Sequence, residues 1–129
     1  MNSAGSNYDI SRMSANGDTQ QPLTSSSGMD TDPTYSPNGK SIAFLSNRDG
    51  TNDVWLMDAT GGLQRRHFAN QMKDEYAPSW SPDGKKIAFF SVRNNENTNI
   101  YRMTSTGGLQ TPLTTTAFSD NDPSWQPLP

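Results

Sequence analysis

Short apolar stretches recur along the chain and predict β-strands rather than helices. Residues 86–90 are apolar on both faces, which is typical of a strand covered on both sides. Residues 99–103 place Ile100 on one face and Tyr101 and Met103 on the other. No stretch of useful length shows helical periodicity, so the pattern predicts an all-β protein.

Tight turns precede two of these apolar stretches. Residues 36–39 read Ser-Pro-Asn-Gly, and residues 81–84 read Ser-Pro-Asp-Gly. Pro fixes φ at the second position, Asn or Asp tolerates the third, and Gly takes the left-handed fourth. We therefore predict a type I turn that closes a bulged hairpin in each case. The residues that fix these turns are Pro37, Gly39, Pro82 and Gly84.

A group of residues that includes these turns and apolar stretches recurs along the chain at a spacing of 45 residues. Asp32-Pro33 recurs as Ala77-Pro78 and again as Asp122-Pro123. Aromatic residues also recur once per unit, and we expect them to pack between neighbouring units, with a ligand platform as the alternative. These aromatic residues are Tyr35, Trp80 and Trp125 at one position and Trp55 and Tyr101 at another.

Four short antiparallel strands in about 45 residues are typical of a β-propeller blade. We expect full blades at residues 32–69 and 77–114. Residues 7–24 match the third and fourth strands of a blade, and residues 122–129 match the first strand of a further one. Residues 1–6 are expected to be disordered, or the stub of a missing second strand.

One string of residues resembles a known family. APSWSPDGKKIAFFS, followed by NIYRM, GG and PLT, resembles the blade repeat of TolB-like β-propellers, and the resemblance runs from Tyr8 to Pro127. The resemblance implies a propeller, usually six-bladed, in which the first strand of each blade lines a central channel. It also implies protein or peptide binding, often in the bacterial periplasm. The chain departs from the pattern at His67-Phe68 and Gln126, and it carries too few blades.

The strand count predicts self-association. A propeller with so few blades would leave apolar faces exposed. Residues 122–129 of one chain would join the half blade at 7–24 of another, which would then lack only its second strand, so we expect a homodimer that forms a six-bladed ring. The alternatives are a poorly packed monomeric fragment, a fragment that pairs by loose edge contacts, and a larger ring or open array.

Composition narrows the choice of partners and chemistry. The chain has 10 Lys and Arg against 13 Asp and Glu, which argues against nucleic acid as a partner. It has no Cys, which excludes thiolate chemistry, and no apolar run long enough to span a membrane. No catalytic motif occurs, and His67, the single His, is expected to be structural, so we predict no enzymatic activity. The sequence does not indicate a cellular compartment. Residues 1–9 have neither the basic nor the apolar region that is typical of a signal peptide.

Carboxylates gather just before the first strand of each unit. One interpretation is a site at the channel mouth for a cation or a basic peptide. The favoured alternative is turn chemistry, in which Asp before Pro binds its own backbone. Residues 47–53 resemble a calcium loop only in part, because the distal bidentate Glu is missing, so we expect no cofactor and keep a cation as the weaker possibility. The six carboxylates are Asp30, Asp32, Asp74, Glu75, Asp120 and Asp122.

The family resemblance implies a module that binds a protein or peptide, and the patterns above predict that it is non-enzymatic and assembled from more than one chain. Two alternatives stay open. The first is an accessory propeller of a larger serine-peptidase-type hydrolase. The second is a structural fragment that self-assembles without a ligand. Loop side chains, rather than the fold, decide what a propeller binds.

Overall fold

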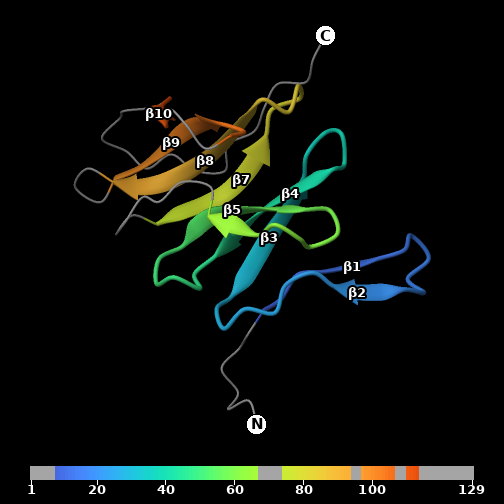
Figure 1. Ribbon diagram of the computed structural model, residues 1–129. Helices are drawn as coiled ribbons and strands as arrows, with labels where there is room; N and C mark the ends of the chain where they lie inside the picture. Colours follow the sequence, from blue (N-terminus) through green and yellow to red (C-terminus); the bar gives the residue numbers. More distant parts are fainter. Residues whose placement is uncertain (1–7, 67–73, 94–96, 107–109, 114–129) are drawn as a thin grey trace.

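The chain folds into strands and turns. The computed structural model describes residues 8–66, 74–93, 97–106 and 110–113. Within these residues ten strands form three antiparallel sheets, which confirms the prediction of an all-β protein (Figure 1). The same residues contain no helix that is long and apolar enough to cross a membrane. The bounds are β1 (Ser11–Met13), β2 (Gln20–Pro22), β3 (Asp30–Tyr35), β4 (Ser41–Ser46), β5 (Asp53–Asp58), β6 (Arg65–Arg66), β7 (Glu75–Trp80), β8 (Lys86–Arg93), β9 (Asn97–Thr104) and β10 (Thr111–Pro112).

Two of the sheets are four-stranded meanders. Strands β3 to β6 form blade 1 in sequence order, and β7 to β10 form blade 2 in the same way. The first two strands, β1 and β2, pair only with each other among the described residues and form the N-terminal hairpin. Blade 1 lies between this hairpin and blade 2, as Figure 1 shows.

The turns between the first and second strands of each blade have the predicted geometry. Gly39 N donates to Ser36 O at 2.8 Å, and Gly84 N donates to Ser81 O at 2.9 Å. The two glycines have φ values of 73° and 74°, in the left-handed region that L side chains rarely adopt. The prediction of a left-handed glycine at the fourth turn position is confirmed.

A bulge interrupts the first strand of each blade at the same place. The register shifts between Thr31 and Thr34 in β3 and between Tyr76 and Ser79 in β7. The residues before the two prolines, Asp32 and Ala77, have φ values of 53° and 52°. Proline has no N–H to donate, so a bulge lets it sit inside the strand without leaving a ladder carbonyl unpaired.

Two apolar clusters hold the three sheets together. The cluster between the blades takes two side chains each from β4 and β5 of blade 1 and two each from β8 and β9 of blade 2. Its buried members are Ala43, Leu45, Val54, Leu56, Ile87, Phe89, Tyr101 and Met103. The second cluster lies on the opposite face of blade 1 and consists of Ile42, Phe44, Trp55 and Met57 with Ile10 and Leu23 from the N-terminal segment. Fully burying one such side chain contributes about 2 kcal/mol.

The alternation of side chains along the middle strands explains why blade 1 has two apolar faces. Ala43 is paired with Leu56 across β4 and β5, and the next pair, Phe44 with Trp55, points to the other side. Strands that bury both faces have no polar face to offer water, which is why residues 42–45 read as one continuous apolar run.

Candidate functional site

Asp30, one of the six carboxylates, lies buried inside blade 1. Its Oδ2 accepts a hydrogen bond from Ser26 Oγ at 2.8 Å, and its Oδ1 accepts one from Arg48 Nη2 at 3.0 Å. Burial acts to raise its pKa, but hydrogen bonds from Ser46, Arg48 and Ser26 outweigh it and lower the pKa. The Asp30 carboxylate is therefore ionised, and its two oxygens are occupied by these hydrogen bonds within the protein.

Glu75 holds the equivalent position in blade 2 and reaches across to blade 1. Its Oε2 accepts a hydrogen bond from Val54 N at 3.0 Å, and its Oε1 accepts one from Gln110 Nε2 at 3.1 Å. The residue is fully buried. This carboxylate satisfies a backbone N–H of the neighbouring blade, so it acts as a link between blades.

Two of the other carboxylates, Asp32 and Asp74, lie in the part of the chain that the structure describes. Asp32 is exposed, and Asp74 is half-buried with its Oδ1 accepting from Asn52 N at 3.0 Å. Asp120 and Asp122 lie outside the described residues. In the part of the chain that the structure describes, no three His, Cys, Asp or Glu side chains converge in a way that would hold a metal ion.

The loop that resembles a calcium loop in part is closed by its own contacts. Gly50 N donates to Asn47 O at 2.9 Å, and Asp49 Oδ2 accepts from Arg66 Nη2 at 2.6 Å. Asp53 follows the loop, and its Oδ2 accepts from Thr51 Oγ1 at 2.9 Å. Burial raises the pKa of Asp53, and its Oδ1 has no hydrogen-bond partner.

Arg48 was not singled out in the sequence, yet it connects Asp30, Gln64 and Trp55. Its guanidinium lies 4.4 Å from the centre of the Trp55 ring and donates to Gln64 Oε1 at 2.8 Å as well as to Asp30. Gln64 in turn donates to Leu23 O at 2.8 Å, which ties the N-terminal segment to blade 1. Only the recurring pair Arg48 and Arg93, 45 residues apart, could have pointed to it.

The recurring aromatic residues have unequal surroundings. Trp55 and Tyr101 are buried in the two apolar clusters. Trp80 is half-buried against the cluster between the blades, and its Nε1 donates to Thr34 O in β3 at 3.1 Å. Tyr35 is 52% exposed, which differs from the inter-blade packing expected at its position. Trp125 lies outside the described residues.

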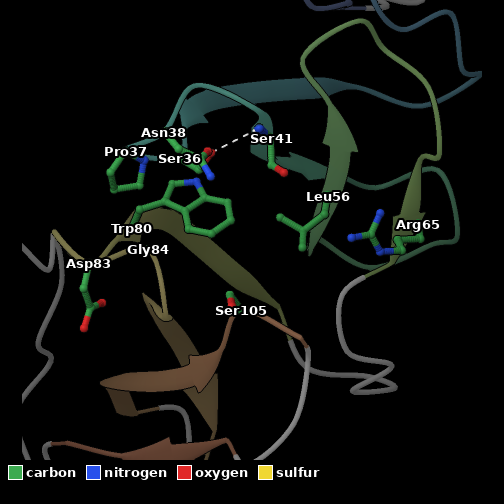
Figure 2. A pocket seen from close by; sticks show the side chains of 10 residues that line it. All are labelled: Ser36, Pro37, Asn38, Ser41, Leu56, Arg65, Trp80, Asp83, Gly84 and Ser105. Atoms are coloured by element: carbon green, nitrogen blue, oxygen red, sulfur yellow. Dashed lines mark hydrogen bonds between the residues drawn. The ribbon is translucent and has the colours of Figure 1, made fainter.

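A groove of about 260 Å³ opens between the blades at their turn ends (Figure 2). Blade 1 contributes the β3–β4 turn and side chains of β5 and β6, and blade 2 contributes Trp80, the β7–β8 turn and the turn after β9. Most of the lining side chains are polar. These polar residues are Ser36, Asn38, Ser41, Arg65, Asp83 and Ser105.

The two ends of the groove carry opposite charges. Figure 2 shows Arg65 at one end and Asp83 at the other, with the Trp80 ring and Leu56 between them. Hydrogen bonds from Lys85 N and Ser81 Oγ lower the pKa of Asp83, so this end is anionic. An apolar middle flanked by opposite charges and hydroxyl groups fits a peptide segment better than a purely apolar ligand.

Comparisons with known proteins agree with this architecture. The family model of the TolB beta propeller domain matches residues 1–128. A structure assigned as TolB from Agrobacterium tumefaciens is similar at 26% identity and a TM-score of 0.75, covering 82% of this chain and 40% of the other. TolB from Acinetobacter baumannii gives 26% identity and a TM-score of 0.74, covering 88% of this chain and 28% of the other.

A more distant structure shares the fold alone. The AtxE2 isopeptidase in its apo form is 15% identical with a TM-score of 0.52, covering 71% of this chain and 19% of the other. The comparison with curated proteins gave no match. The chain spans less than half the length of each of these three solved relatives. Because the family model covers almost every residue, the chain belongs to the TolB beta propeller domain family.

Proposed function

We propose that the chain is a non-enzymatic part of a binding propeller, which is completed by more than one chain and receives a protein or peptide segment in the groove beside Trp80. The observation that carries this proposal is the groove itself. It combines an aromatic wall, hydroxyl and amide groups, and a charge of each sign at its two ends.

The groove lies on rigid elements, which supports a binding role. Its turns are fixed by the left-handed glycines Gly39 and Gly84, and its Trp80 ring is held by the hydrogen bond to Thr34 O. A wall that is already ordered loses little conformational entropy when a ligand binds. Extended peptides bind well to such surfaces, since backbone groups pair with polar walls while one side chain packs on the aromatic ring.

A library of displayed random peptides, selected on the immobilised chain, tests the proposal. We expect enriched peptides that bind in fluorescence polarisation and lose about five-fold in affinity with Arg65→Gln or Asp83→Asn, because a hydrogen bond to a partly exposed charge contributes about 1 kcal/mol. Asp83→Asn keeps the acceptor that closes the β7–β8 turn. Lys85→Gln is the matched control, because Lys85 is exposed on the same turn and lies outside the groove lining.

The proposal fails if no peptide is enriched, or if enriched peptides bind all three variants equally. Assembly is measured separately, as solution mass by light scattering over a dilution series. A mass that stays at twice 14.2 kDa or a higher multiple supports a propeller built from several chains, and a folded monomer of 14.2 kDa contradicts it.

A further inference from the structure

The N-terminal side of blade 1 is only partly covered. Blade 1 supplies four apolar side chains to the cluster that it shares with blade 2. The N-terminal segment supplies two, Ile10 and Leu23, to the matching cluster on the other face of blade 1. The missing contribution corresponds to the first two strands of a blade, since β1 pairs only with β2 among the described residues.

A hollow of about 190 Å³ lies at this incompletely covered place. Its apolar walls include Ile10, Pro33 and Ile42. Two further wall residues, Tyr35 and Met13, are 52% and 65% exposed. Large apolar side chains that gather around a hollow mark a surface where another segment packs.

The repeat indicates which kind of segment packs there. Trp80 has the position in blade 2 that Tyr35 has in blade 1, and it donates from its Nε1 to Thr34 O of the preceding first strand at 3.1 Å. Strand β7 also contacts β3 directly. By the same repeat, Tyr35 should contact the first strand of the blade that precedes blade 1. The sequence holds one further first-strand segment, Pro123-Ser124-Trp125, in the position of residues 78–80.

We propose that residues 122–125 of a second copy occupy this hollow. In this arrangement the backbone carbonyl of the second copy's Ser124 accepts from the Tyr35 hydroxyl, as Thr34 O accepts from Trp80. Charge supports the pairing. Arg12 borders the hollow, Asp122 is the first residue of the segment, and Asp120 lies two residues before it. This inference rests on the proposed assembly from several chains and adds the surface and the segment that make the contact.

The absence of Cys allows a direct test by cross-linking. Two variants, Tyr35→Cys and Ser124→Cys, are mixed and treated with a short bis-maleimide. We expect the product that joins position 35 of one chain to position 124 of the other in at least five-fold excess over products between like chains. The joined peptides are identified by mass spectrometry.

Lys85→Cys mixed with Ser124→Cys is the control, because Lys85 is exposed on blade 2 away from the hollow. A yield for positions 35 and 124 no higher than this control overturns the inference. Light scattering on the untreated mixture separates two failures. If the mass is at least twice that of one chain, the assembly stands and this docking surface is wrong. If the mass is that of a single chain, both the assembly and this docking surface are wrong, and peptide binding in the groove is still decided by its own test.

Discussion

Asp30 and Glu75 occupy the same position in successive blades, but one extra methylene changes what each of them binds. Glu75 reaches the backbone N–H of Val54 in the blade before it. Asp30 is shorter and binds Ser26 and Arg48 of its own region instead. The matching N–H, that of Ile10, is satisfied by Thr24 Oγ1 at 2.9 Å. The same requirement is therefore met by a different residue in each unit.

Thr24→Val should destabilise the N-terminal segment. Valine keeps the shape of threonine but cannot accept the hydrogen bond from Ile10 N, and a buried N–H without a partner costs about 1–2 kcal/mol. We expect a lower midpoint in urea and faster hydrogen exchange at the Ile10 amide. Thr24→Ser keeps the acceptor and should lose less. Equal losses in the two variants would show that the methyl group, rather than the hydrogen bond, matters.

Asp53→Asn should stabilise the protein at neutral pH. Burial raises the pKa of Asp53, so its ionised form is less favourable in the folded chain than in the unfolded chain. The contribution of protonated Asp53 to the free energy of unfolding is complete at pH values below its ordinary pKa of 3.8. This contribution is lost as the pH rises through the raised pKa of the folded protein. We expect Tm at pH 7 to rise by about 3 °C and the gain to vanish in acid.

The next unit supports this substitution, because buried Asn99 holds the equivalent position in blade 2. Asp49→Asn is the control, since Asp49 is exposed and its ion pair with Arg66 should contribute under about 1 kcal/mol. A gain in Tm for Asp53→Asn that persists at pH values below the ordinary pKa of Asp would contradict an effect of ionisation.

Trp80→Phe should weaken the contact between the two first strands. The substitution removes the indole N–H that donates to Thr34 O and part of the apolar surface against the inter-blade cluster. The expected loss is about 2 kcal/mol in the free energy of unfolding, measured by chemical denaturation. Tyr35→Phe, at the same position of the repeat, should change the free energy of a single chain by less than about 0.5 kcal/mol.

Gly61→Ala should cost more than Gly39→Ala. Both glycines have positive φ, 91° and 73°, so an alanine is strained at either position by about 1–2 kcal/mol. At Gly61 a Cβ would also lie 2.9 Å from Leu23 O, whereas nothing lies within 4 Å of a Cβ at Gly39. We expect Gly61→Ala to be at least about 1 kcal/mol less stable in thermal unfolding. Equal costs would mean that the N-terminal segment moves away freely.

The blade pattern was predictable because local chemistry carries it. Pro and Gly fix the turns, and the continuous apolar runs at residues 42–45 and 87–90 identify strands covered on both faces. Strand ends were harder to place, since β3 and β7 begin at Asp30 and Glu75, before the bulged residues Asp32 and Ala77. A buried carboxylate at the start of a strand looks like a turn residue until its partners in other strands are known.

The surroundings of single side chains were less predictable, because they depend on neighbours far away in sequence. Tyr35 and Trp80 are equivalent in the repeat, but Trp80 has a first strand before it and Tyr35 has none among the described residues. The groove between the blades was also missed, since its two charged ends, Arg65 and Asp83, are brought together only by the packing of one blade on the next.

Blade 1 packs against blade 2 on one apolar face and against the N-terminal segment on the other. This arrangement would allow a chain to gain further blades by duplication. A tandem duplication of a 45-residue segment would bring both complementary surfaces with it, so the new copy would fit between existing blades without a new interface. Selection would then hold the apolar runs and the Pro and Gly residues of the tight turns, while other loop positions could diverge. The similarity of SPNGKSIAFL and SPDGKKIAFF is what a duplication of this kind would leave in the sequence.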